Sequence, residues 1–306
     1  MDILFAGSPH SSANILKYLI TNELFNIVGV ITQPDKKGKR GNKLVESPVS
    51  ALAKKHNICT FKPSSFKDNK FLNSIREINA DYLVVIAYGK ILPKWLIDLP
   101  RVCPINVHFS LLPKYRGASP IQAALLNGDK ETGITFMKIS SELDAGDIIS
   151  FNKINISKID NKLILERNLT SLCIDNISNV LTRLSNNDIS MVKQEHSKAT
   201  FCKKIKKQDS LIDFNDTSEK INNKFRAYFE WPGLNFLYKN ILIKVHGLGI
   251  KDIKSTGDPG SLYKFDRSGI YLNTIDRVIV ITHLQLPNKG IISSNDLFNS
   301  NNDFFI

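Results

Sequence analysis

The sequence is poor in cysteine and lacks long apolar runs. Its four cysteines lie far apart, with no CxxC or mixed Cys/His spacing, which excludes both a zinc-ligand motif and a disulfide framework. No run of about 18 apolar residues occurs, and the N-terminus has no basic segment followed by a hydrophobic one. We therefore expect a cytoplasmic protein that holds no metal and has no membrane association.

Acidic residues are scarce relative to basic ones. The chain carries 29 acidic and 41 basic residues, a net charge of +12, and this excess indicates either a polyanionic partner or a codon bias towards lysine. Two basic clusters, at 36–43 and 198–207, lie outside the apolar runs. We expect these clusters to contact a polyanion, the alternative being solvated surface charge. Their candidate residues are Lys36, Lys37, Lys39, Arg40, Lys43, Lys203, Lys204, Lys206 and Lys207.

A glycine-rich nucleotide fingerprint is missing too, although the first half of the chain alternates strand and helix patterns. The first apolar run, at 2–7, ends in Gly-Ser-Pro rather than GxGxxG. Further apolar runs at 25–32, 81–89 and 102–108 are separated by segments with helical periodicity. This alternation predicts an α/β domain with a mostly parallel, doubly wound sheet, in which ligands bind outside the carboxyl ends of the strands.

The last third of the chain has a different pattern. A helical pattern at 163–184 is followed by a polar, lysine-rich connector and then by short strand patterns separated by turn signals. Such spacing predicts a small β-barrel. We therefore expect an α/β domain at 1–189, a basic linker at 190–207 and a smaller C-terminal domain at 208–306.

A polar pair occupies the end of one buried strand pattern. Residues i and i+2 of a strand point to the same side, so Asn106 and His108 share one face while their apolar neighbours take the other. Farther along, Asp144 lies in a turn between two strand patterns. Taken singly, each residue has an ordinary structural explanation, because Asn and His are often satisfied hydrogen bonders and Asp favours turns.

Taken together, these residues resemble a known family. Asn-x-His runs into SLLPKYRG and is followed later by LDAGD, a combination that resembles the formyltransferases that use 10-formyltetrahydrofolate. Further similar stretches, such as FAGSP, TQPDKKGKRG and FRAYFEWPG, extend through nearly the whole chain. The resemblance implies a Rossmann-like formyltransferase domain and a C-terminal, OB-like β-barrel that binds tRNA.

The resemblance also assigns site residues. It implies that Asn106, His108 and Asp144 are catalytic and that a loop directly after the strand contacts the folate. Phe109 departs from the family pattern, which has a small residue between the histidine and the serine. The loop residues are Ser110, Leu111, Leu112 and Pro113.

Formyl transfer requires residues of these types. When an amine attacks the formyl carbon, negative charge develops on the formyl oxygen and the amine must lose a proton. An asparagine amide can donate to that oxygen, and one such donor is worth roughly 3 kcal/mol. A histidine can protonate the departing folate nitrogen, while a carboxylate orients the imidazole and collects the proton of the amine. Neither a metal nor a covalent nucleophile is needed.

The acceptor is the remaining question. The resemblance implies that the formyl group of 10-formyltetrahydrofolate goes to the amino group of methionine on initiator tRNA, for bacterial translation initiation, and that the enzyme is a monomer. Alternatives are a formyltransferase or formyltetrahydrofolate hydrolase acting on a small molecule, such as glycinamide ribonucleotide or a nucleotide sugar, and a non-enzymatic RNA-binding protein. The basic connector and the extra β-domain favour the large anionic acceptor.

Overall fold

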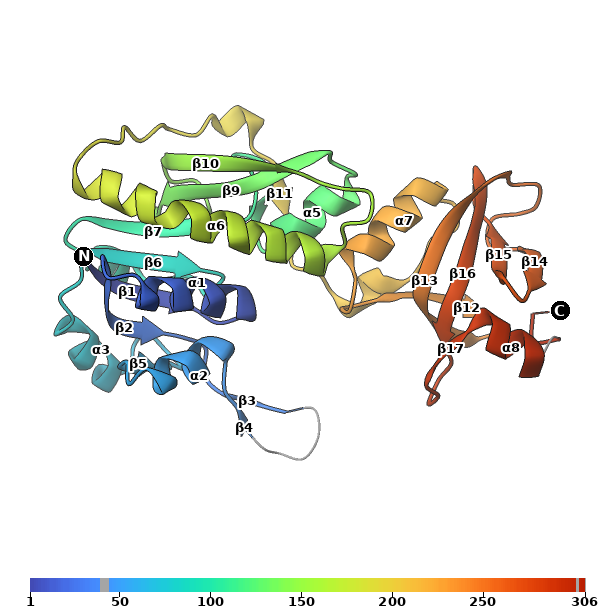
Figure 1. Ribbon diagram of the computed structural model, residues 1–306, viewed down its shortest axis with the longest axis horizontal. Helices are drawn as coiled ribbons and strands as arrows, with labels where there is room; N and C mark the ends of the chain where they lie inside the picture. The colour runs from blue at the N-terminus through green and yellow to red at the C-terminus, as the bar shows by residue number, and fades with distance from the viewer. Residues whose placement is uncertain (39–43, 301–302, 306) are drawn as a thin grey trace. The chain divides into compact units, whose positions relative to one another are not determined.

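The computed structural model describes residues 1–38, 44–300 and 303–305 and divides into two compact units (Figure 1). Unit 1 comprises 1–120, 131–155 and 166–203, and unit 2 comprises 121–130, 156–165 and 204–306. The units are thus not continuous in sequence, because two short segments, 121–130 and 156–165, cluster with the C-terminal part. The linker predicted at 190–207 stays a prediction.

Unit 1 is built on a seven-stranded, mostly parallel sheet with the strand order β10-β9-β7-β6-β1-β2-β5. The four pairings from β7 to β5 are parallel, whereas β9 pairs antiparallel with both β7 and β10. The predicted α/β class is confirmed. The strands are β1 (Asp2–Gly7), β2 (Asn26–Ile31), β5 (Thr60–Phe61), β6 (Tyr82–Ile86), β7 (Cys103–His108), β9 (Glu131–Lys138) and β10 (Ile148–Asn155).

Helices cover both faces of this sheet. Every residue of β6 is buried, as its continuous apolar run predicts for a strand between two helical layers. On one face, Phe71 and Ile75 of α3 pack with Leu4 and Leu83 in a single apolar cluster. On the other, the Tyr82 hydroxyl donates to a carbonyl of α6. The helices of the first 185 residues are α1 (His10–Thr21), α2 (Pro48–Lys55), α3 (Asn69–Arg76), α4 (Lys94–Ile97), α5 (Pro120–Leu126) and α6 (Lys162–Ser185).

The strand register brings the carboxyl ends of the parallel strands to one edge. Gly7 of β1 lies opposite Ile86 of β6, whose neighbour Val85 lies opposite Asn106 of β7. Ala6 lies opposite Ile31, the last residue of β2. Asn106 and His108 therefore end their strand at the edge where ligands of such sheets bind.

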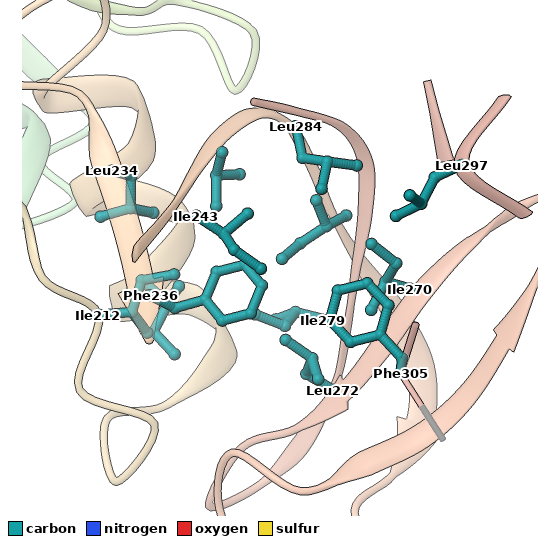
Figure 2. Close-up of a cluster of buried hydrophobic side chains, with 13 residues drawn as sticks. Ile212, Leu234, Phe236, Ile243, Ile270, Leu272, Ile279, Leu284, Leu297 and Phe305 are labelled. Atoms are coloured by element: carbon teal, nitrogen blue, oxygen red, sulfur yellow. The ribbon is translucent and has the colours of Figure 1, made fainter. Parts of the chain in front are cut away.

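Unit 2 is dominated by an antiparallel sheet in the order β12-β13-β16-β15-β14, with β17 paired to β16. Alternate residues of these strands, with Phe305, fill the core shown in Figure 2. Register shifts in the long strand β13 bend the sheet around that core. The smaller, β-rich C-terminal domain is thus confirmed. Its elements are α7 (Ser218–Ala227), β12 (Leu234–Tyr238), β13 (Ile241–Lys254), β14 (Leu262–Asp266), β15 (Gly269–Asn273), β16 (Arg277–Gln285), β17 (Ile291–Ser293) and α8 (Ser294–Ser300).

None of the described helices is both long and apolar enough to cross a membrane.

Alanine substitutions of two isoleucines test the core of unit 2. Ile279 is fully buried in the cluster, whereas Ile275 is 60% exposed. We expect Ile279→Ala to lower the free energy of unfolding by about 2–5 kcal/mol, because it removes buried methyl groups and leaves a cavity. Ile275→Ala, the matched control, should change it by less than about 0.5 kcal/mol. Urea unfolding, followed by Trp231 fluorescence in a Trp95→Phe background, measures the free energy of unfolding of both variants. Equal losses in the two variants would contradict the assignment of Ile279 to the core of unit 2.

Candidate active site

His108 is the last residue of β7, and its imidazole is buried. Its Nε2 lies 2.8 Å from the carbonyl oxygen of Tyr115. Because a carbonyl oxygen only accepts hydrogen bonds, Nε2 carries a proton whether the ring is neutral or charged. In the neutral ring Nδ1 therefore presents a lone pair.

Asp144 faces that nitrogen. Its Oδ2 lies 3.7 Å from His108 Nδ1, within range of an ion pair but too far for a direct hydrogen bond. The same Oδ2 accepts a 2.8 Å hydrogen bond from the backbone N–H of Gly117. The turn that sequence analysis identified is thus folded so that its carboxylate can stabilise a charged imidazole.

Asn106 completes the predicted trio. It is half-buried two residues before His108 on β7, and strand alternation places both side chains on the same face. Within the described residues, its side-chain amide has no hydrogen-bond partner, so both of its N–H groups are available to a ligand. The structure therefore brings together all three residues that the sequence singled out.

The loop after β7 is held by a threonine that sequence analysis missed. Thr135 of β9 is fully buried; its hydroxyl donates to the Ser110 carbonyl at 2.7 Å and accepts from the Leu112 N–H at 3.1 Å. The Ser110 hydroxyl donates to the Lys114 carbonyl. Phe109, the departure from the family pattern, is only 8% exposed, so its ring fills core space. The Ser110–Pro113 loop thus has a fixed backbone.

A short parallel ladder holds the stretch of backbone that contacts His108 and Asp144. Strand β8 (Arg116–Gly117) pairs with β11 (Phe201–Cys202). The Tyr115 carbonyl that accepts from His108 also accepts from the Cys202 thiol at 3.3 Å. Burial raises the pKa of that thiol, which keeps its proton on Sγ for this bond.

Comparison with known proteins identifies the family. The Formyl transferase family model matches residues 1–181, and the model of the Formyl transferase C-terminal domain matches residues 204–302. A methionyl-tRNA formyltransferase from Thermotoga maritima is 40% identical over 290 residues, covering 94% of this chain and 92% of the relative. The chain belongs to the formyl transferase family. It is therefore a formyltransferase enzyme.

Solved structures of other formyltransferases share the fold. A sugar 3N-formyl transferase, solved in the presence of dTDP and 5-N-formyl-THF, has a TM-score of 0.68 at 21% identity and covers 95% of this chain and 99% of its own. An N-formyltransferase from Helicobacter canadensis, in complex with folinic acid and dTDP-3-aminofucose, has a TM-score of 0.67 at 21% identity over 91% and 98%. At this identity the likeness concerns the fold alone.

Behind the candidate site lies a buried polar pair that sequence analysis did not find. Arg116 is 1% exposed, and its Nε and Nη2 donate to Gln194 Oε1 at 3.1 and 2.8 Å. Gln194 Nε2 in turn donates to the carbonyls of Asp144 and Gly146. The arginine stands in the KYRG stretch, but nothing in the sequence shows that it is buried or that a distant glutamine is its partner.

The predicted RNA-contacting residues lie at the surface where the structure describes them. Lys36 and Lys37 form strand β3, exposed and paired antiparallel with β4 (Leu44–Val45). The other cluster is equally exposed, around the 3₁₀ turn that begins at Lys207. Lys39, Arg40 and Lys43 lie outside the described residues. The exposed members of the second cluster are Lys203, Lys204, Lys206 and Lys207.

No three His, Cys, Asp or Glu side chains of the described residues are grouped so that they could hold a metal ion.

Substitution of Gly117 tests the backbone geometry around Asp144. Its φ is +121°, and a Cβ there would overlap the carbonyl oxygen of Cys202. We expect Gly117→Ala to lower the free energy of unfolding by about 2 kcal/mol or more, because both the backbone conformation and the close approach require glycine. Gly290→Ala, where an added Cβ would meet no atom within 4 Å other than those of its chain neighbours, should change it by less than about 0.5 kcal/mol. Differential scanning calorimetry compares the two; an unaffected Gly117→Ala would refute this local geometry.

Proposed function

We propose that this enzyme transfers the formyl group of 10-formyltetrahydrofolate to the amino group of methionine on initiator tRNA, in bacterial translation initiation. The likeness to the Thermotoga maritima relative, which extends over 94% of this chain and through both family models, carries this choice of acceptor. The lysines of the two clusters that the structure describes are exposed, and they support an acceptor that is a large polyanion.

In this proposal Asn106 stabilises the developing oxyanion. Attack of the amine forms the new C–N bond and moves an electron pair of the formyl C=O bond onto oxygen. The free N–H groups of Asn106 can then donate to that oxygen without first giving up a protein partner. A donor that is already positioned costs no reorganisation when the charge appears.

His108 moves the proton in this proposal. The attacking amine must lose a proton, and the folate nitrogen leaves with the electron pair of the old C–N bond and takes one up. Because Nε2 donates to Tyr115, Nδ1 of the neutral ring is free to accept the amine proton and return it to the leaving nitrogen. Asp144 stabilises the imidazolium in between, from 3.7 Å.

The remaining assignments concern the two substrates. We assign contact with the folate donor to the fixed loop of Ser110, Leu111, Leu112 and Pro113, which begins two residues after His108. We assign phosphate contact to the lysine clusters, including Lys39, Arg40 and Lys43 of the first one. Within the described part of the chain the candidate lysines of these clusters have no carboxylate partner, and such like charges are what a phosphate backbone would neutralise.

Product identity tests the acceptor. The purified protein is incubated with 10-formyltetrahydrofolate and, separately, with charged initiator tRNA, free methionine or glycinamide ribonucleotide. Formylmethionyl-tRNA as the main product supports the proposal. Formylated glycinamide ribonucleotide, or formate released without an acceptor, would replace it with a small-molecule transferase or a hydrolase.

Alanine substitutions test the catalytic trio. Asn106→Ala, His108→Ala and Asp144→Ala should each lower turnover by about a hundredfold or more, because each removes a group that acts on the transition state. The affinity for charged tRNA should change little, since none of the three is assigned to RNA. Single-turnover formylation and filter binding measure the two quantities. Near-normal turnover in any variant would remove that residue from the mechanism.

Salt dependence tests the second lysine cluster. Replacing Lys203, Lys204, Lys206 and Lys207 with glutamine should weaken binding of any tRNA and flatten the dependence of log Kd on log salt by about one unit for each phosphate that the variant no longer neutralises. Lys153→Gln is a matched control, because Lys153 already pairs with Glu131 at 2.8 Å. An unchanged slope in the quadruple variant would show that the cluster is only solvated charge.

A further inference from the structure

Gln194 and Arg116 connect to the candidate site through the backbone of the turn that carries Asp144. The Gln194 side chain is 4% exposed, and its Nε2 lies 2.9 Å from the Asp144 carbonyl and 2.7 Å from the Gly146 carbonyl. Both protons of this amide are therefore used on one turn. Asp144 itself adopts φ +49°, a left-handed conformation that costs free energy for any residue other than glycine.

Arg116 decides which way the glutamine amide points. A guanidinium has only donors, so the amide must turn its oxygen towards Arg116 and its nitrogen towards the two carbonyls. The bidentate contact, at 3.1 and 2.8 Å, fixes that orientation more firmly than a single bond would. The other partners of the guanidinium are farther away, with Glu142 Oε1 at 3.5 Å and His196 Nδ1 at 3.4 Å.

We propose that Gln194 and Arg116 are positioning residues of the formyl transfer: they hold the strained turn so that the Asp144 carboxylate stays between the Gly117 N–H and His108 Nδ1. Neither residue touches the imidazole or the carboxylate. They act on the 3.7 Å separation between Asp144 Oδ2 and His108 Nδ1, because lengthening it weakens the attraction between the carboxylate and the imidazolium and changes the geometry of the site. This inference rests on the proposed role of His108 and Asp144.

Gln194→Glu separates positioning from packing. A glutamate has the same shape and still accepts from Arg116, but an ionised carboxylate cannot donate to the Asp144 and Gly146 carbonyls. We expect kcat to fall about tenfold or more, with the KM for charged tRNA unchanged within about twofold, because only the geometry of the reacting groups is disturbed. Asn176→Asp, on α6, is the control: its side chain already accepts from Asn152, and kcat should be unchanged.

A second measurement needs no substrate. The Gly117 N–H is bonded to Asp144 Oδ2, so its hydrogen exchange, followed by NMR, should accelerate in Gln194→Glu and not in Asn176→Asp. Both the fall in kcat and the faster exchange are required. If either stays at the wild-type value, the positioning role is overturned.

The acceptor that the wild-type enzyme uses tests the proposed function separately from the positioning role. If the wild type formylates glycinamide ribonucleotide instead of tRNA, the acceptor is wrong, yet kcat with that acceptor and the Gly117 exchange still decide the positioning role. Should Gln194→Glu fail to fold, Arg116→Lys carries the test. Lysine keeps the charge but lacks the bidentate fork, so kcat should fall at least about threefold with KM unchanged. An unchanged kcat in Arg116→Lys would overturn the inference.

Discussion

The backbone from Tyr115 to Gly117 supplies one acceptor and one donor that together fix the side chains of His108 and Asp144. The Tyr115 carbonyl accepts from His108 Nε2, and the Gly117 N–H donates to Asp144 Oδ2, both at 2.8 Å. A single rigid segment thus sets the orientation of the imidazole and the position of the carboxylate. It also fixes the tautomer, because the first contact keeps the proton of the neutral ring on Nε2 and leaves a lone pair on Nδ1.

The surroundings of this segment keep an unfavourable backbone in place. Tyr115 and Asp144 both have positive φ values, and such conformations persist only where neighbouring contacts over-determine them. The ladder between β8 and β11 provides those contacts on one side, and the buried Arg116 and Gln194 provide them on the other. The buried guanidinium is tolerated because it donates two hydrogen bonds to Gln194 Oε1. The Gln194 amide is itself satisfied, since its nitrogen donates to the carbonyls of Asp144 and Gly146.

The candidate site belongs to unit 1, and the β-rich C-terminal part belongs to unit 2. Asn106, His108, Asp144, Arg116 and Gln194 all belong to unit 1, where the register of the parallel strands brings the polar end of β7 to the ligand-binding edge of the sheet. Unit 2 has its own core, filled from alternate residues of its antiparallel strands. The rigid sheet is thus the scaffold for a site that is completed by loops.

The sequence by itself determined what depends on local periodicity. Continuous apolar runs predicted the buried parallel strands, and alternation along β7 placed Asn106 and His108 on one face, because strand geometry repeats every two residues. Only the tertiary structure decided how far Asp144 lies from that face, which imidazole nitrogen is free, and that Arg116 and Gln194, 78 residues apart in the chain, are partners. Such contacts depend on how loops return to the sheet, and no periodicity within a segment records which distant segment will lie beside it.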